Sequence, residues 1–132
     1  MYKRQVGKRP RTYISPTIVK GENNIYAIAT PGGDAIVKVL ANIIMDTSAF
    51  GTEPQEALDK LRMYFMGNGI IWYERGFDTP LIAEVSGYGY AAVANTNHTL
   101  FGNVAIAGYS SSEGYYAAAD LRRGGESKAL SE

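Results

Sequence analysis

Hydrophobic positions along the chain change their spacing several times, which predicts short strands mixed with helices. The clearest case is an apolar run at 25–29, followed by the turn Thr30-Pro31-Gly32-Gly33 and a longer apolar stretch at 34–45. β-branched and aromatic residues in the first run favour a buried strand. The second stretch is apolar at most positions, so it predicts a helix buried around most of its surface, with Asp34 at its N-terminus.

The rest of the pattern predicts further strands and helices in an α+β layered domain. A strand at 13–19 forms a hairpin with the run at 25–29, and Thr52 opens a capping-box spacing for a helix over 53–66. The other expected elements are a strand at 70–73, a helix at 78–86 with Leu81, Ile82 and Val85 inward, and a strand meander at 90–94, 103–107 and 115–119. The first strand has the composition of an interior one, which indicates that the chain begins in the middle of a larger sheet.

Length and composition restrict the function classes. A chain of 132 residues with 45% hydrophobic content predicts one domain, and its formal net charge of zero gives no overall field to recruit nucleic acid. The absence of cysteine excludes disulfides, thiolate nucleophiles and thiolate metal sites. The only histidine, His98, is expected in a loop, and a zinc site needs more nitrogen donors. We therefore expect no metal and no cofactor.

Basic residues cluster ahead of the first acidic residue, Glu22, at Lys3, Arg4, Lys8, Arg9 and Arg11. A solvated arm explains them better than a nucleic-acid contact, because no regular series of aromatic stacking residues follows. No apolar run approaches the length of a membrane span, and the first residues do not lead into the apolar core of a signal peptide. Neither a nucleic-acid partner nor a membrane span is expected in this segment.

The glycines of the turn are the best candidates for chemistry. They lie where a strand passes into a helix, so backbone N–H groups can point at a ligand with no Cβ in the way. The alternative is a tight turn that needs glycine only for its backbone conformation, and this segment alone favours that alternative.

Four motifs in sequence resemble the C-terminal part of the γ-glutamyltranspeptidase small subunit. They are Gly7-Lys8-Arg9-Pro10, Ser15-Pro16-Thr17-Ile18-Val19, Pro31-Gly32-Gly33 and Asp120-Leu121-Arg122-Arg123-Gly124-Gly125, with Glu56-Ala57-Leu58 and Arg62 in the matching helix. The resemblance covers residues 7–130. It leaves residues 1–6 as an unmatched arm and residues 131–132 as a tail.

The resemblance implies an incomplete αββα sandwich of the N-terminal nucleophile hydrolases. Enzymes of this family cut themselves to expose a threonine, which attacks γ-glutamyl amides such as glutathione and passes the acyl group to water or an amino acid. Gly32 and Gly33 then take the role of oxyanion donors through their backbone N–H groups. The nucleophile of the family lies upstream of the Gly7-Lys8-Arg9-Pro10 segment, so the expected partner is the missing N-terminal portion of the enzyme. The chain alone is expected to be inactive, and the family pattern implies a periplasmic or extracellular location.

Two departures from the family pattern affect the expected specificity. Thr12 and Tyr13 stand where the family has a serine pair that holds the α-carboxylate of the γ-glutamyl group. Thr12 keeps a hydroxyl, whereas Tyr13 moves its hydroxyl away and adds bulk, so a relative acting on another acyl amide is an alternative. Tyr13 is equally well explained as a core or rim aromatic. Leu121 replaces a proline, which is expected to alter a turn only.

Two questions stay open from the sequence. Arg122 and Arg123 are expected to pair with carboxylates that hold the C-terminal segment, with surface exposure of one of them as the alternative. The second question is activity. A non-catalytic relative that serves as a binding or structural module would show the same motifs.

Overall fold

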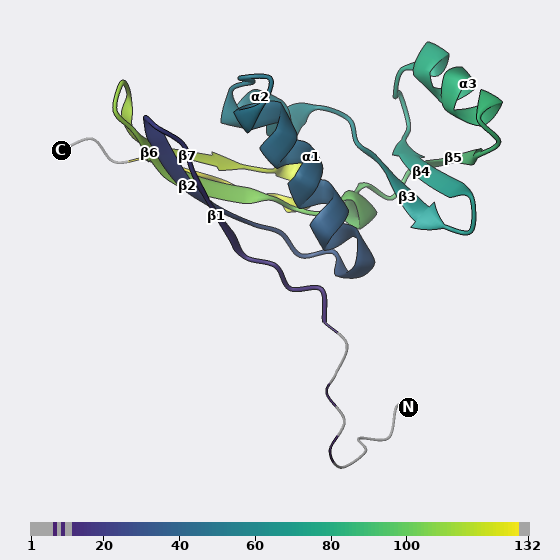
Figure 1. Cartoon of the computed structure of the whole chain (residues 1–132), viewed down its shortest axis with the longest axis horizontal. Coiled ribbons are helices and arrows are strands. Elements are labelled where there is room, and N and C mark those ends of the chain that lie inside the picture. Colours follow the sequence, from purple (N-terminus) through teal and green to yellow (C-terminus); the bar gives the residue numbers. More distant parts are fainter. Residues whose placement is uncertain (1–6, 8, 10–11, 130–132) are drawn as a thin grey trace.

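Two β-sheets of different size form the frame of the molecule (Figure 1). The structure, a computed structural model, describes residues 7, 9 and 12–129, so the predicted arm at 1–6 and tail at 131–132 lie outside the described residues. The larger sheet has the antiparallel order β1 (Thr17–Lys20), β2 (Asn24–Ala29), β6 (Ala105–Ser110), β7 (Gly114–Ala119). The smaller sheet has the order β3 (Met63–Gly67), β4 (Ile70–Glu74), β5 (Ala91–Asn95), with β5 parallel to β4.

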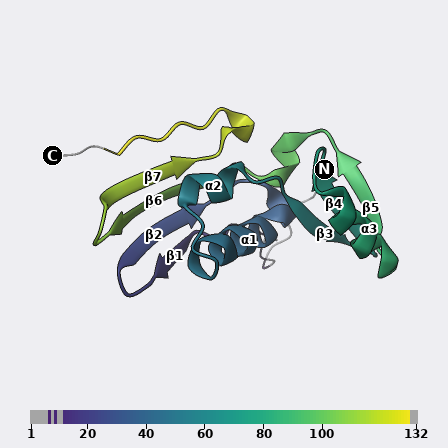
Figure 2. The same cartoon turned by 90° about the horizontal axis from the view of Figure 1, so that it is seen from above.

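The helices divide between the two sheets. Along the chain they are the 3-10 turn η1 (Gly33–Ala35), α1 (Ile36–Ser48), α2 (Pro54–Asp59), α3 (Thr79–Gly87), η2 (His98–Phe101) and η3 (Leu121–Arg123). Helices α1 and α2 lie over one face of the larger sheet, and α3 lies beside the smaller one (Figures 1 and 2). None of these helices is long and apolar enough to cross a membrane, a finding that covers the described residues only.

The core lies between the larger sheet and helices α1 and α2. Alternate residues of each strand point toward the helices, as the two-residue period of a strand requires. Tyr26 and Ile28 of β2 are 3% and 1% exposed, and the Tyr26 hydroxyl lies 2.8 Å from Thr47 Oγ1 of α1. The buried apolar residues that complete this core are Ala35, Ile36, Val39, Leu40, Ile43, Ala57, Leu58, Tyr64, Phe101, Val104, Ile106 and Ala118.

The opposite face of the larger sheet is apolar and largely uncovered by the described residues. Its central positions are small, with Ala27, Ala107 and Ala117 side by side in the strand register. Ile18 and Tyr115 on the same face are each 73% exposed, and an open hollow of about 620 Å³ lies over it. The C-terminal segment runs back beside β7 (Figure 2), where Ser127 Oγ donates to the Ala117 carbonyl.

Several predicted elements are confirmed. The strand at 25–29 and the helix near 78–86 are present within a residue of their expected bounds; the helix after the turn is also present, and the hairpin before the turn forms with a shorter first strand. Leu81, Ile82 and Val85 form the half-buried side of α3, as predicted. The strands expected at 70–73, 90–94, 103–107 and 115–119 are also present, with shifts at their ends.

The helix predicted over 53–66 is wrong in its second half. Helix α2 ends at Asp59, because Lys60 has φ −57° and ψ 139°, and residues 63–67 form β3 instead. Pairing with β4 and burial of Tyr64 outweigh the helical spacing of the apolar residues. The N-cap is Glu53 and makes no side-chain capping bond, whereas Thr52 accepts a hydrogen bond from Lys60.

Three other expectations are corrected. The late strands do not form one meander, since β5 joins the smaller sheet while β6 and β7 join the larger one. The first strand begins at Thr17 and not at Tyr13; β1 lies at the edge of the described sheet, and its place inside a larger sheet stays a prediction. Helix α1 is buried on one side only, because Val37 and Met45 are 51% and 54% exposed.

A buried group of ionised side chains, called here the ionic cluster, joins the two sheets: Arg62, Glu74, Asp120 and Arg122. Arg62 Nη1 donates to Asp120 Oδ2 at 2.6 Å, and Arg122 Nη2 donates to Glu74 Oε2 at 2.6 Å. Arg122 also bridges to Asp120 Oδ1 at 3.1 Å. Glu74 ends β4 and Asp120 directly follows β7, so these bonds connect the end of the smaller sheet to the end of the larger one.

We expect Arg62→Met to lower the free energy of unfolding by about 3 kcal/mol or more, because it removes the cation from a buried ion pair and leaves Asp120 with fewer partners. Combining it with Asp120→Asn should cost at least about 1 kcal/mol less than the sum of the two single changes, since the pair interacts directly. Urea denaturation of the four proteins measures both quantities.

Lys60→Met is the matched control, because Lys60 pairs with Asp46 at an exposed site and should cost under about 1 kcal/mol. A cost for Arg62→Met no larger than that of the control would contradict the role given to the ionic cluster.

Candidate functional site

The turn between β2 and α1 has a backbone that requires glycine. Gly32 has φ 145° and Gly33 has φ 57°, both in the region that side-chain-bearing residues rarely adopt. A Cβ built on Gly33 would meet nothing within 4 Å, so the space in front of this residue is open. The turn predicted at Pro31-Gly32-Gly33 is therefore present, and both glycines have a conformational reason to be there.

The carbonyl groups of this turn are used inside the fold, while two of its amides are not. Gly32 O accepts from Ala35 N–H at 3.2 Å, and Gly33 O accepts from Ile36 N–H. Among residues 12–129, no hydrogen bond uses the N–H of Gly32 or of Gly33. Two backbone donors at the start of a helix, beside open space, can stabilise negative charge on a ligand oxygen.

A neighbouring loop fixes the position of the turn. The Thr30 hydroxyl donates to Pro31 O at 2.9 Å and accepts from Asn103 N–H at 2.8 Å. Asn103 Oδ1 in turn accepts from Arg123 N–H at 3.1 Å, so the turn is linked to the C-terminal motif. Sequence reasoning missed Thr30 and Asn103. A hydroxyl residue directly before Pro-Gly-Gly was the available signal for the first, whereas nothing local to Asn103 marks it.

The two residues expected to bind substrate precede β1 and differ in burial. Thr12 is exposed, and its Oγ1 accepts from Ile14 N–H at 3.2 Å, which leaves the hydroxyl proton able to bond elsewhere. Tyr13 is half-buried and its ring packs against the core, as expected for a core or rim aromatic. A binding role for either residue stays a prediction.

The C-terminal motif supplies much of the ionic cluster. Burial alone raises the pKa of Asp120, but the Arg122 N–H and the charges of Arg62 and Arg122 bring it below its ordinary value. Burial likewise raises the pKa of Glu74, and hydrogen bonds from Arg122 and His98 lower it overall. For Arg62 burial dominates and lowers the pKa, with help from the nearby Arg122 charge. Both carboxylates are therefore held ionised.

The two arginines of the motif have different surroundings. Arg122 pairs with Glu74 and Asp120, and burial lowers its pKa less than these partners raise it. Arg123 is exposed, and its guanidinium donates to the Thr99 carbonyl. One of the two is thus paired and the other lies at the surface. Glu74 was missed in the sequence, although a carboxylate that ends an apolar strand was a visible signal.

His98 lies in η2, where Nδ1 is 2.9 Å from Glu74 Oε1. It is half exposed, and no group of three or more His, Cys, Asp and Glu side chains placed to hold a metal ion occurs within the described part of the chain.

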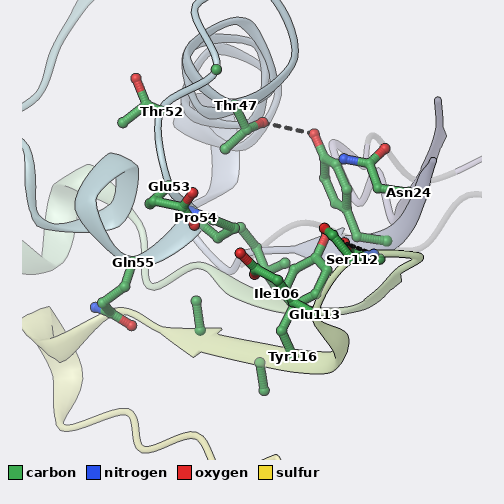
Figure 3. A pocket seen from close by; sticks show the side chains of 15 residues that line it. Asn24, Thr47, Thr52, Glu53, Pro54, Gln55, Ile106, Ser112, Glu113 and Tyr116 are labelled. Atoms are coloured by element: carbon green, nitrogen blue, oxygen red, sulfur yellow. Dashed lines mark hydrogen bonds between the residues drawn. The ribbon is translucent and has the colours of Figure 1, made fainter. Parts of the chain in front are cut away.

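A separate hollow of about 400 Å³ lies at the other end of the larger sheet (Figure 3). Its walls include Asn24 at the start of β2, Glu53 before α2 and Tyr116 of β7. Because the Pro31-Gly32-Gly33 turn follows the opposite end of β2, this hollow does not contain the two free amides. The cavity of about 400 Å³ and the candidate oxyanion donors therefore lie at different places in this chain.

Comparison with solved structures identifies the class of fold. The chain matches the Bacillus anthracis transpeptidase enzyme CapD with a TM-score of 0.85 at 24% sequence identity, over 96% of this chain and 75% of that chain. The fold is a mixed α+β arrangement that corresponds to part of such a transpeptidase chain.

Sequence comparison then identifies the family. The family model described as Gamma-glutamyltranspeptidase matches residues 2–130, so the chain belongs to the γ-glutamyltranspeptidase family, as its motifs predicted. The glutathione hydrolase proenzyme of Bacillus subtilis is 26% identical over 87 residues, which cover 65% of this chain and 15% of that protein. The glutathione hydrolase 5 proenzyme of Mus musculus is 26% identical over 122 residues, which cover 91% of this chain and 21% of that protein. The chain thus spans a small part of the length of these relatives.

The lowered pKa values of Glu74 and Asp120 predict how stability depends on pH. The unfolded chain binds more protons than the folded chain at pH values between the folded and unfolded pKa, so stability falls as the pH falls through that range. Unfolded carboxyl groups titrate near about pH 4. We therefore expect the contribution of these two carboxylates to the free energy of unfolding to be constant near neutral pH and to decline below about pH 4. Urea denaturation at each pH measures this.

Glu74→Gln should lower stability at neutral pH and flatten the acid decline, because the replaced group no longer titrates. Glu56→Gln on the exposed surface of α2 is the control and should leave the profile in place. An identical acid decline in wild type and Glu74→Gln would exclude Glu74 as a source of the pH dependence.

Proposed function

We propose that this chain forms the oxyanion-stabilising part of an enzyme that cleaves γ-glutamyl amides, such as glutathione, through an acyl-enzyme. The threonine nucleophile comes from a segment outside this chain. The observation that carries the proposal is the pair of Gly32 and Gly33 amides, which have no acceptor among the described residues and face open space on the Gly33 side. Membership in the γ-glutamyltranspeptidase family supports the same chemistry.

The proposed reaction uses the turn when charge develops. The threonine hydroxyl attacks the amide carbonyl, and its proton passes to the threonine α-amine and then to the leaving amine. Negative charge builds on the carbonyl oxygen, where N–H groups of Gly32 and Gly33 donate hydrogen bonds. Removing one such donor typically costs about 3 kcal/mol of barrier stabilisation. Water or an amine acceptor then attacks the resulting ester and releases the acyl group.

The uncovered face of the larger sheet supports an assembly with the rest of the enzyme. Helices cover only the inner face, so a second sheet on the outer face would complete the αββα sandwich expected from the family resemblance. The alanines at 27, 107 and 117 allow a second layer to approach closely, and Ile18 and Tyr115 offer exposed apolar surface at its rim. The proposed partner is therefore the missing N-terminal portion of the same enzyme.

We expect the 132-residue chain alone to release no chromophore from a γ-glutamyl anilide. Producing it together with the preceding segment of its reading frame should give a self-cleaving protein that does. An assembled protein that neither cleaves itself nor turns over the anilide would reject the proposal. Activity of the isolated chain would reject the external nucleophile.

Gly33→Ala in the assembled enzyme should lower kcat by about 10²-fold or more, because a methyl group enters the space in front of the donors. Gly51→Ala is the matched control, since Gly51 has φ 66°, also meets nothing within 4 Å and lies in the loop before α2. Equal losses in the two variants would mean that backbone strain alone explains the effect.

Tyr13 favours a second candidate, a related amide hydrolase with a different acyl group. Its ring packs against the core where the family has a serine hydroxyl for the γ-glutamyl carboxylate. If Tyr13 excludes that carboxylate, Tyr13→Ser should raise kcat/KM for γ-glutamyl anilide by about tenfold, the effect of about one hydrogen bond. A panel of acyl anilides measures the change, and a Tyr13→Ser variant with unchanged preference would leave specificity to other residues.

A further inference from the structure

One hydroxyl group makes two hydrogen bonds that bracket the turn. Thr30 Oγ1 donates its only proton to Pro31 O at 2.9 Å and accepts the Asn103 N–H at 2.8 Å. The Asn103 bond fixes where the oxygen lies, and the Pro31 bond fixes where the proton points. The side chain therefore holds the carbonyl oxygen of the peptide unit that joins Pro31 to Gly32.

That peptide unit also carries the N–H of Gly32. A peptide bond is planar and trans, so its oxygen and its amide hydrogen point in opposite directions. The structure contains no cis peptide bond among the described residues. Holding the Pro31 oxygen toward Thr30 consequently turns the Gly32 N–H away from Thr30 and leaves it without an acceptor among the described residues.

The loop that contacts Thr30 is shaped to come close to it. Gly102 has φ 88°, and a Cβ built there would lie 2.7 Å from Thr30 Oγ1 and 3.3 Å from Val39 Cγ1. Asn103 is held from its other side by Arg123 N–H, and Val104 N–H donates to Asp120 Oδ2. The loop is thus fixed to the ionic cluster, and the Thr30 hydroxyl is the link between that loop and the turn.

We propose that Thr30 is a positioning residue whose hydroxyl sets the direction of the Gly32 N–H by holding the Pro31 carbonyl. This inference rests on the proposed function, because it assigns Gly32 as an oxyanion donor. Thr30 touches no reacting atom. Its effect passes through one peptide plane, so it depends on the hydroxyl group and not on the size of the side chain.

The test compares Thr30→Val, which keeps the shape without the hydroxyl, with Thr30→Ser, which keeps the hydroxyl. In the assembled enzyme Thr30→Val should lower kcat about tenfold to a hundredfold with KM little changed, since a misaimed donor fails mainly in the transition state. Thr30→Ser should restore kcat to within a few-fold of wild type. Thr52→Val, which removes a hydroxyl bonded to Lys60 at a remote site, should leave kcat unchanged.

A second measurement does not need activity. In the ¹⁵N-labelled 132-residue chain, Thr30→Val should shift the Gly32 amide resonance and speed hydrogen exchange at Asn103 by about tenfold or more, because that amide loses its acceptor. Thr30→Ser and Thr52→Val should leave both signals near their wild-type values. A wild-type enzyme without turnover would reject the proposed function, and the Gly32 and Asn103 signals would then decide the inference by themselves.

Three results would overturn the inference: wild-type kcat in Thr30→Val, equal losses in Thr30→Val and Thr30→Ser, or a Gly32 resonance that does not move in Thr30→Val. If Thr30→Val fails to fold, Thr30→Ser decides the inference. If Thr30→Ser lost as much kcat as Gly33→Ala, the inference would be overturned, because the serine keeps the hydroxyl.

Discussion

Charge burial is the constraint on which the rest of this structure depends. Glu74, Asp120 and Arg62 are 0%, 1% and 3% exposed, so each ionised group needs the others to offset its loss of water. These residues come from the end of β4, the end of β7 and the loop before β3. Their geometry is set by direct bonds of 2.6 to 3.1 Å that also involve Arg122. A shift of either sheet would separate charges that cannot be left unpaired, and this restriction defines how the smaller sheet sits against the larger one.

The same constraint extends to the candidate site through main-chain groups. Asp120 accepts from Val104 N–H, and the neighbouring Asn103 side chain accepts from Arg123 N–H. The loop held in this way presents Gly102 and Asn103 to Thr30 at the start of the turn. A C-terminal motif rich in charge therefore acts on a glycine turn that lies about ninety positions earlier in the chain. The Pro31-Gly32-Gly33 turn and the motif at 120–125 resemble the family separately in the sequence. In the fold, hydrogen bonds through Asn103 connect them.

Local signals in the sequence predicted most elements but not how they assemble. The strand at 25–29 and the helix after it could be predicted because a proline, two glycines and a change of period all lie within a few residues. The segment 60–66 was predicted as helix because Leu61, Tyr64 and Phe65 have helical spacing, and only pairing with β4 makes residues 63–67 a strand. β7 joins its sheet through a local hairpin with β6, whereas the pairing of β6 with β2 and of β5 with β4 joins strands distant in sequence, which no local pattern encodes.

The residues of the candidate site also divide into those that local sequence predicts and those that only the fold reveals. Gly32 and Gly33 were found because their backbone requirement is a local one that residue type reveals. Thr30 and Asn103 bond to each other across 73 positions, and Glu74 bonds to residues 12 to 48 positions away, so their roles follow from the fold. Tyr13 was predicted only in part. The sequence shows that it differs from the family's serine, but only the fold shows that its ring packs against the core.

The pairing of β2 with β6 sets an order of events during synthesis. Asn24 pairs with Ser110 and Ala29 with Ala105, so the strand that leads into the turn has no complete neighbour on that side until residue 110 has been made. Closing a loop of this length is slow compared with forming a local hairpin. The last residues that hold Asn103 and the ionic cluster arrive later still, at Asp120 to Arg123. The turn can therefore take its final geometry only after residues 103–123 have been made and have folded against it, so any chemistry at this turn depends on these later residues.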